Sequence, residues 1–335
     1  SIIFKFHMNN QTISKEILNW YDNNKRILPW RKHLTKKKKH YFTLVSEVML
    51  QQTQVKTVIP YFNNFIKKIP EFKDLANVDD RKLLKCWEGL GYYSRARNLK
   101  KAAKKIIDEF NGKLPNNIDQ LKSLPGVGEY TSTAIMAIVF NQSFIPLDGN
   151  VERILKRVLF LKSEQEIAKD NLLKKKSFFG KSKKPSDYAQ AIMEIGALIC
   201  KPISPLCQEC PIQKRCLAFK KKDFKIISKN KFNKTKYFQA DVYKKKRKYH
   251  LIKNNKFNFL KNLLIFPMKE IDKKQYKLSL SKRINIKMSN MEMKIIINEK
   301  NKNFKFNKSI LMDKNDIKKY ILPSFTKKIF KSISK

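Results

Sequence analysis

The sequence has no long run of apolar residues. Its apolar segments are too short to span a bilayer, and the first residues, SIIFKFHMNNQTIS, lack a long apolar core and a small-residue cleavage site. We therefore expect a cytoplasmic protein without a membrane partner. Met8 is as good a candidate for the natural first residue as Ser1.

Cysteine is also scarce. Only five occur, and four of them fall within residues 200–216. This distribution fits a metal site in a reducing compartment better than a disulfide framework. The four form a C-x6-C-x2-C-x5-C array: Cys200, Cys207, Cys210 and Cys216. Thiolates at this spacing suit an iron–sulfur cluster or a zinc ion, and spacing alone does not separate the two.

Acidic side chains are few relative to basic ones. The chain has 28 Asp and Glu against 74 Lys and Arg, a formal net charge of +46. Such an excess favours a polyanionic partner, usually DNA or RNA. Part of it reflects Lys, Asn and Ile enriched throughout, as AT-rich coding would cause, so charge alone does not establish nucleic-acid binding.

A stretch from Leu121 to Asn150 organises the chain. It contains Leu-Pro-Gly-Val-Gly, in which Gly126 and Gly128 allow close backbone approach, followed by an apolar segment of helical length. The free N–H groups at the start of that helix suit a phosphate, so we interpret the turn as a clamp for a nucleic-acid backbone. Asp148 follows twenty-three residues after Pro125.

Glu47 is a second candidate acid. It is the only acid between Asp22 and Glu71 and has apolar neighbours in a segment that runs from Tyr41 to Ile59 and ends at Pro60. Such an acid is usually a surface residue of an amphipathic helix. If it is buried, desolvation raises its pKa and it can act as a general acid. The uncharged amides of Gln51 and Gln52, which follow it, suit probing bases or filling a gap in a duplex.

Tyr92 lies in the segment Trp87–Asn98, which combines a glycine-rich bend, two tyrosines and two arginines. Aromatic residues at a bend can wedge between base steps, and arginines can bind phosphates. Taken alone, this segment is better explained by core aromatics and surface charge.

The 335 residues suggest two domains or three modules. Alternating apolar patterns predict strands over 249–259, 263–267 and 291–306, after a linker at 222–238. This places a mostly β module at 239–335.

Several segments together resemble adenine DNA glycosylases of the MutY type, in the helix-hairpin-helix superfamily that includes endonuclease III. The segments are LPWR (28–31), SEVMLQQTQV (46–55), GLGYYSRARNL (89–99), LPGVGEYT (124–131), LDGNV (147–151) and the cysteine array. The resemblance covers most of the first two-thirds of the chain. It implies a mainly α region over 8–221, with a six-helix domain at about 30–140 and a cluster domain from 8–29 and 141–221.

The resemblance also implies an activity: flipping and excision of adenine mispaired with 8-oxoguanine or guanine in double-stranded DNA. Glu47 would protonate the adenine ring, and Asp148 would stabilise the oxocarbenium-like sugar. Gln52 and Tyr92 would wedge into the duplex. Arg31, Tyr130 and Asn150 would line the pocket and orient the water or the carboxylates. The four cysteines would bind one [4Fe–4S] cluster, and the protein would act as a monomer.

Two departures from related sequences matter. The endonuclease III branch has an attacking lysine where this chain has Tyr130, so we expect a monofunctional enzyme with little strand cleavage. The implied C-terminal module is α+β and Nudix-like. Its closing motif resembles 322–326, but the family's Ser-His pair is Phe330-Lys331 here, which puts recognition of 8-oxoguanine in question.

Two alternatives are compatible with the sequence. A thymine DNA glycosylase for T·G mismatches shares the Glu, Tyr and Asp positions, although Gln51-Gln52 and Gly149 favour adenine. A catalytically weakened DNA-binding relative is the other, although Glu47 and Asp148 would repel phosphate and are hard to explain in a simple binder.

Overall fold

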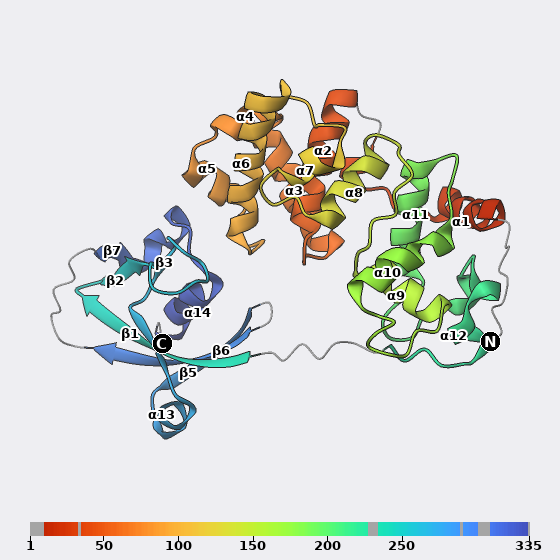
Figure 1. Ribbon diagram of the computed structural model, residues 1–335. Helices are drawn as coiled ribbons and strands as arrows, with labels where there is room; N and C mark the ends of the chain where they lie inside the picture. Colours follow the sequence, from red (N-terminus) through yellow and green to blue (C-terminus); the bar gives the residue numbers. More distant parts are fainter. Residues whose placement is uncertain (1–9, 33–34, 227–233, 289–290, 301–308, 334–335) are drawn as a thin grey trace. The chain divides into compact units, whose positions relative to one another are not determined.

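The computed structural model of the protein describes residues 10–32, 35–226, 234–288, 291–300 and 309–333. The chain forms two compact units, Ser1–Val78 with Arg97–Lys229, and Asp79–Ala96 with Asn230–Lys335. Figure 1 traces both along the chain. Met8 and the predicted start of the cluster domain lie outside the described ranges. Within those ranges, no helix is long and apolar enough to cross a membrane.

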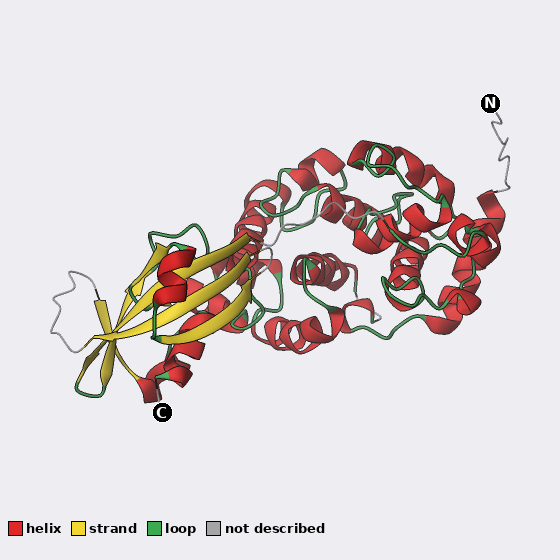
Figure 2. Cartoon of the chain, turned by 90° about the horizontal axis from the view of Figure 1, so that it is seen from below, coloured by secondary structure: helices red, strands yellow, loops and turns green. Residues whose placement is uncertain are grey.

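The first unit is helical wherever the structure gives it regular secondary structure (Figure 2). Its α-helices are α1 (Asn10–Asn24), α2 (Lys36–Leu50), α3 (Val55–Lys68), α4 (Phe72–Asn77), most of α6 (Tyr93–Phe110), α7 (Ile118–Lys122), α8 (Glu129–Ile138), α9 (Gly149–Val158), α10 (Lys169–Lys175), α11 (Pro185–Leu198) and α12 (Leu217–Lys220). Short 3-10 turns are η1 (Pro29–Arg31), η2 (Lys176–Phe179), η3 (Cys207–Glu209) and η4 (Gln213–Arg215). The mainly α character predicted for this region is confirmed.

The predicted segment from Tyr41 to Ile59 is divided between two helices. α2 ends at Leu50 and α3 starts at Val55. Gln52 between them has φ of 58°, a left-handed conformation that a right-handed helix cannot include. Pro60 lies inside α3, so the expectation that the segment ends there is wrong. The break places the glutamines in a turn at the end of the Glu47 helix.

Helix α11 is central to the first unit. It packs against α1, α8 and α9, and its sequence, PSDYAQAIMEIGAL, is apolar on nearly every side. Ile192 and Ile195 of α11 are buried with Ile17 of α1 and Leu155 of α9 in one core cluster. Because α11 packs against both α8 and α9, the side chains that these three helices direct to the same side are held in fixed relation.

The second unit contains a sheet. Its strands are β1 (Lys234–Lys245), β2 (Lys248–Lys253), β3 (Leu264–Ile265), β4 (Met268–Ile271), β5 (Lys282–Met288), β6 (Met291–Lys300) and β7 (Ser309–Asp313). The strand order is β3-β2-β1-β6-β5, with β4 also paired to β1 and β7 to β2. β1 and β6 are parallel, whereas the other pairs are antiparallel.

The strands differ in extent from those expected. β1 begins at Lys234, inside the predicted linker, and β2 ends at Lys253 instead of residue 259. Only two residues of the predicted strand at 263–267 pair as a strand, and the end of the predicted strand at 291–306 lies outside the described residues. Asn254 ends β2 early, because its side chain binds the Phe257 and Phe259 carbonyls and folds 254–259 into a loop.

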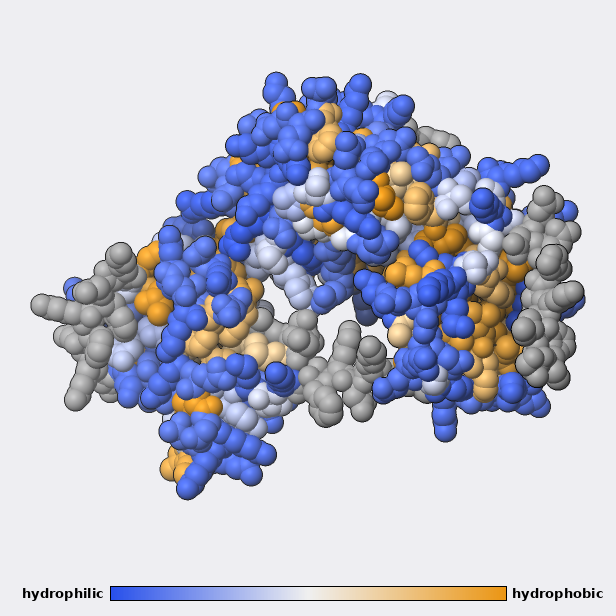
Figure 3. All heavy atoms as spheres, in the orientation of Figure 1, coloured by the Kyte–Doolittle hydropathy of each residue, from blue (hydrophilic) through white to orange (hydrophobic). Residues whose placement is uncertain are grey.

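Helices complete the second unit: α5 (Asp80–Cys86), α13 (Lys273–Leu278) and α14 (Ser324–Ser332), with the 3-10 turn η5 (Lys314–Lys319). Phe325, Ile329 and Phe330 of α14 are buried in the core against the sheet. On the face drawn in Figure 3 most of the surface is hydrophilic, as expected for a chain with 74 Lys and Arg.

Candidate active site

One cavity of about 990 Å³ in the first unit brings together most of the predicted catalytic and DNA-binding residues. The predicted residues that line it are Arg31, Glu47, Gln51, Gln52, Tyr130, Asp148 and Asn150. Its volume is at the upper end of the range typical of small-molecule sites. Gly126 and Gly128 belong to the same unit but do not line the cavity, and Tyr92 belongs to the second unit.

Glu47 is buried in the wall of this cavity. α2 places it among apolar side chains with 5% of its surface exposed, and the Tyr130 hydroxyl donates a 2.9 Å hydrogen bond to its Oε2. Burial raises the pKa of Glu47 to about 7, although Tyr130 and the charge of Arg31 oppose that rise. The carboxyl group can therefore hold a proton near neutral pH.

Asp148 has a different environment. It is the N-cap of α9, and its Oδ1 accepts hydrogen bonds from the backbone N–H groups of Asn150 at 2.9 Å and Val151 at 2.7 Å. The Asn150 side-chain amide donates to Oδ2 at 3.0 Å. Burial raises the pKa of Asp148, and these three hydrogen bonds oppose the rise because they favour the ionised form. The helix N-terminus also favours a negative charge at this position.

Arg153 is a residue that the sequence analysis missed. Its Nη2 donates to Asn150 Oδ1 at 2.7 Å and to the Gly196 carbonyl at 2.6 Å, while its Nε donates to the Cys200 carbonyl at 2.6 Å. One guanidinium therefore connects the amide beside Asp148 to the backbone of the first cysteine in the array. Its place one turn after Asn150 on α9 was the only available sequence signal.

Glu194 was also missed. It is fully buried on α11 and accepts hydrogen bonds from Arg26 Nε at 2.6 Å and Arg31 Nη1 at 2.7 Å. All three side chains line the cavity. A lone acid in the apolar segment YAQAIMEIGALIC is the same signal that singled out Glu47. The arrangement fixes two guanidinium groups at the cavity wall.

The Gly-x-Gly turn is built closely against its neighbours. Gly126 has φ of 83°, and a Cβ at this position would lie 3.0 Å from Asn98 Cβ. Gln51 Nε2 donates to the Gly126 carbonyl at 3.3 Å, which ties this turn to the turn after α2. α8 starts directly after Gly128, whose position has no side-chain cap. Its first N–H groups are thus placed to bind an anion.

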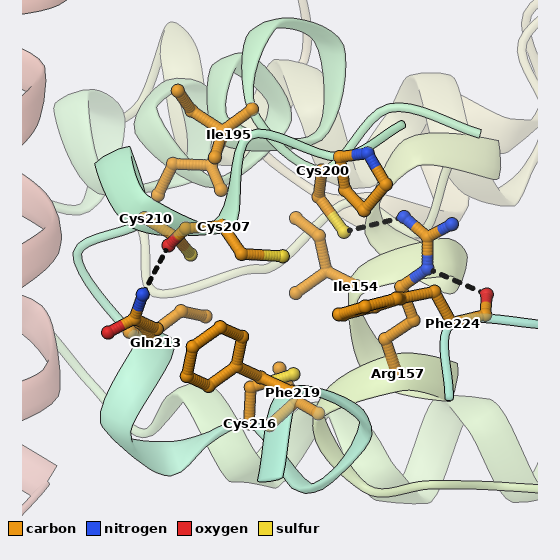
Figure 4. A pocket seen from close by; sticks show the side chains of 14 residues that line it. Ile154, Arg157, Ile195, Cys200, Cys207, Cys210, Gln213, Cys216, Phe219 and Phe224 are labelled. Atoms are coloured by element: carbon orange, nitrogen blue, oxygen red, sulfur yellow. Dashed lines mark hydrogen bonds between the residues drawn. The ribbon is translucent and has the colours of Figure 1, made fainter. Parts of the chain in front are cut away.

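The four cysteines of the array line a second cavity in the first unit, between α9, α11 and α12. Figure 4 shows the sulfur atoms of Cys200, Cys207 and Cys216 turned toward one central space. Over the residues described, no three His, Cys, Asp or Glu side chains converge in a way that could hold a single metal ion.

The surroundings of the cysteines bear on their ionisation. Burial, followed by the charges of the other cysteines, raises the pKa of Cys207, and burial raises the pKa of Cys210 to about 12. Arg157 Nη1 donates to Cys200 Sγ at 3.4 Å and to the Lys201 carbonyl at 2.6 Å. Four thiolates here would need compensating positive charge within the cavity.

The chain is similar to proteins of known class. A family model described as HhH-GPD superfamily base excision DNA repair protein matches residues 45–177. The adenine DNA glycosylase of Buchnera aphidicola subsp. Schizaphis graminum is 36% identical over 282 residues, which cover 82% of this chain and 79% of the relative. The adenine DNA glycosylase of Rattus norvegicus is 41% identical over 211 residues, 61% of this chain and 41% of the relative. This chain thus spans about two fifths of the rat protein.

Solved structures have the same helical fold. A thermostable thymine-DNA glycosylase superposes with a TM-score of 0.56 at 26% identity, over 63% of this chain and 97% of that one. Endonuclease III trapped as a covalent intermediate with DNA superposes with a TM-score of 0.53 at 25% identity, over 63% of this chain and 95% of that one. The first unit is therefore an endonuclease III-like helical region, and the sheet is an additional C-terminal part.

Proposed function

Since the chain belongs to the adenine DNA glycosylase family, we propose that it excises adenine from mispairs in double-stranded DNA by hydrolysis of the N-glycosidic bond. The observation that carries this proposal is the pair of buried carboxyl groups in one cavity, one with a pKa of about 7 and one held by three hydrogen bonds. Two carboxyl groups with different environments suit an acid and a charge-stabilising partner.

Glu47 is the proton donor in this proposal. Adenine is a poor leaving group as an anion, and a proton on its ring makes departure easier. A carboxyl group with a pKa of about 7 is about half protonated at neutral pH. Transfer of its proton at this pH therefore costs little free energy. Tyr130 fixes the carboxyl group by its hydrogen bond, and Arg31 lies in the same cavity wall.

Asp148 stabilises the positive sugar that forms as the bond breaks. Its charge acts on the oxocarbenium-like centre directly or through a transient covalent bond. Asn150 orients that carboxylate through the bond to Oδ2. Tyr130 stands where the lyase branch has a nucleophilic lysine, and a phenol forms no Schiff base, so the reaction stops at the abasic site.

In this proposal the DNA duplex binds at the turn before α8 and at the turns that carry Gln51, Gln52 and Tyr92. The α8 N-terminus with Gly126 and Gly128 binds a backbone phosphate. Gln51, Gln52 and Tyr92 occupy the gap left by the flipped base. Gln52 and Tyr92 both have left-handed backbone conformations, with φ of 58° and 50°. Such conformations are uncommon outside glycine and place both side chains at sharp turns, although eight other described non-glycine residues also have a positive φ.

The four cysteines hold one [4Fe–4S] cluster in this proposal. Four cysteines that line one cavity could bind either an iron–sulfur cluster or a zinc ion, and the resemblance to the family favours the cluster. The positively charged core would supply the charge that the buried thiolates require and would fix the fold of residues 200–216. Arg157 donates a hydrogen bond to Cys200 Sγ. Such hydrogen bonds to the ligating sulfur atoms are common around metal centres.

The preference between 8-oxoguanine and guanine opposite the adenine depends on the C-terminal module in this proposal. The sheet and α14 support the proposal that this module has a Nudix-like fold. Phe330, at the position of the family's serine, is buried in its core and offers no polar atom for a base. We therefore expect a weaker preference for 8-oxoguanine than in relatives with the Ser-His pair.

Single-turnover base release tests the proposal on three duplexes: adenine opposite 8-oxoguanine, adenine opposite guanine, and thymine opposite guanine. Abasic sites are scored with and without alkali. Adenine release that needs alkali for strand breakage is the expected result. Thymine release would transfer the chain to the activity named for its structural neighbour. Tight binding without release from any duplex would indicate a catalytically weakened relative.

A further inference from the structure

The turn that carries Tyr92 is held rigidly within the second unit. Gly89, Gly91 and Tyr92 have φ of 100°, 78° and 50°. A left-handed tyrosine is strained by roughly 1 kcal/mol or more, so its surroundings must fix it. Trp87 Nε1 donates to the Gly91 carbonyl at 3.0 Å, and Arg95 Nη2 donates to the same carbonyl at 3.2 Å. The Arg95 guanidinium also lies over the Tyr92 ring, 5.1 Å from its centroid.

Glu88, directly before this turn, is bound by two lysines. Its Oε2 accepts from Lys85 of α5 at 2.6 Å, and its Oε1 accepts from Lys327 of α14 at 2.7 Å. Only 12% of the Glu88 side chain is exposed. Burial acts to raise the pKa of Glu88, but the hydrogen bonds from Lys327 and Lys85 outweigh it and hold that pKa below its usual range. The side chain is therefore a fixed, ionised link between two helices.

The contacts around this link extend to η5. Lys85 Nζ donates to the Lys318 carbonyl at 2.7 Å, and Arg81 Nη2 donates to the Lys319 carbonyl at 3.3 Å. α5 and the Tyr92 turn thus pack as part of the C-terminal module, although more than 200 residues separate them in sequence from α14. Such a unit moves as one body more readily than its two segments move apart.

We propose that the C-terminal module positions the Tyr92 wedge, and that Lys327 is the positioning residue, acting through Glu88. The inference rests on the wedge role proposed above for Tyr92. Positioning of Tyr92 would be a function of the module that does not depend on the Ser-His pair expected from the resemblance. Phe330 anchors α14 in the core, and Lys327, one turn earlier on the same helix, faces Glu88. Engagement of the module with DNA therefore sets where Tyr92 enters the duplex.

The test uses the full chain and a duplex with 2-aminopurine beside an adenine–guanine mispair. Fluorescence at saturating protein reports unstacking by the wedge, and single-turnover release reports chemistry. Tyr92→Ala defines the signal without a wedge. Lys327→Met should lose at least half of the fluorescence change and slow release about tenfold, the size typical of coupled pairs. Lys328→Met removes the same charge from the same helix and should stay within about twofold of wild type on both readouts.

A double-mutant cycle gives the second arm. Glu88→Gln should lose at least as much as Lys327→Met, because it also weakens the bond to Lys85. Adding Lys327→Met to Glu88→Gln should cause no further loss, because the bond between the two residues is already broken. Thermal unfolding identifies any variant that has lost its fold. If one single variant is unfolded, the other single variant tests the positioning role. A Lys327→Met protein with the full fluorescence change, or additive losses in the double variant, would overturn the inference. Wild-type unstacking without base release would instead contradict the proposed function and leave the link intact.

Discussion

The hydroxyl of Tyr130 and the carboxyl group of Glu47 are joined by a 2.9 Å hydrogen bond inside the cavity. Burial holds the pKa of Tyr130 well above 10, so the phenol remains a donor throughout the working range of pH. The same burial raises the pKa of Glu47 to about 7. The bond favours the ionised carboxyl group, so Tyr130 limits how far that pKa rises. In the proposed reaction, the pair would therefore set the pH range over which Glu47 can deliver a proton.

Replacing Glu47 by glutamine should abolish base release and increase stability in alkaline solution. The folded-state pKa of about 7 exceeds the ordinary value of 4.5, so the folded protein binds more protons between these values and loses stability as pH rises through them. Glutamine has no such loss. Relative to wild type, the free energy of unfolding should rise by up to roughly 3 kcal/mol at pH 8 and change little at pH 4.5. Denaturant unfolding at both pH values measures it.

Glu109→Gln is the control for that measurement, because Glu109 is an exposed acid on α6. It should change stability by less than about 0.5 kcal/mol at either pH. If Glu47→Gln changed the free energy of unfolding equally at pH 4.5 and pH 8, folding would not raise the pKa of Glu47. Normal turnover by Glu47→Gln would remove it from the role of proton donor.

Tyr130→Phe should shift the pH dependence of release. Without the hydroxyl, the hydrogen bond that lowers the pKa of Glu47 is lost and the pKa rises further. The alkaline limb of the single-turnover pH–rate profile should move to higher pH, with a slower plateau by about tenfold because the carboxyl group is less well fixed. Tyr188→Phe removes another buried hydroxyl, bonded to the Phe179 carbonyl, and should leave the profile in place. An unmoved limb in Tyr130→Phe would refute the coupling.

Gly196 should be intolerant of any side chain. A Cβ here would lie 2.5 Å from Asn150 Cβ and 3.1 Å from its carbonyl carbon, so the first turn of α9 would have to move. Because Asn150 orients Asp148, Gly196→Ala should slow release about a hundredfold, as small displacements of reacting groups do. Gly112→Ala, at a position with φ of 70°, should reduce stability without slowing release. Wild-type release by Gly196→Ala would show that α9 adjusts freely.

Local patterns in the sequence were enough to predict the parts of the site that lie close together along the chain. Leu-Pro-Gly-Val-Gly indicated the turn before α8, the spacing after that turn indicated Asp148, and isolation among apolar residues indicated Glu47. The two acids line one cavity. The Glu194 bridge to Arg26 spans 168 residues and follows no periodic pattern, so it becomes evident only when α11 packs against α1, which Arg26 follows in the chain.

The C-terminal module was less predictable for a related reason. Alternating apolar residues indicated strands, but pairing decides where a strand begins. β1 starts at Lys234 because β6 runs parallel to it from Met291 onward, which recruits residues that the composition had suggested as linker. The association of α5 with α14 depends on side-chain contacts between distant segments, such as Glu88 with Lys327, that no local pattern records.

Cys207→Ser should remove the visible absorption expected of an iron–sulfur cluster and weaken duplex binding, because residues 200–216 would lose their anchor. Cys86→Ser is the matched control. Cys86 is a buried thiol with 3% exposure outside the array, and its replacement should leave the absorption unchanged. A wild-type protein without visible absorption that contains one zinc by elemental analysis would establish the zinc alternative. Unchanged absorption in Cys207→Ser would remove that cysteine from the ligand set.

Phe330→Ser should not strengthen recognition of 8-oxoguanine, although it places at this position the serine that the family resemblance implies. The ring is fully buried, 4.8 Å from Phe266 and 5.4 Å from Tyr249 between centroids. Deleting it should cost about 3–5 kcal/mol of unfolding free energy, and the new hydroxyl would be desolvated. Phe330→Leu keeps the position apolar and should lose less. Lys331→His changes an exposed neighbour and should leave stability unaltered.

The ratio of adenine release opposite 8-oxoguanine to release opposite guanine separates stability from recognition in these variants. We expect Phe330→Ser to lower the unfolding temperature without raising that ratio, because a residue enclosed by the sheet and α14 has no path to a base. A raised ratio at unchanged stability would mean that α14 exposes residue 330 when DNA binds. The core of the module would then be adaptable, and the residue at position 330 would affect specificity as well as packing.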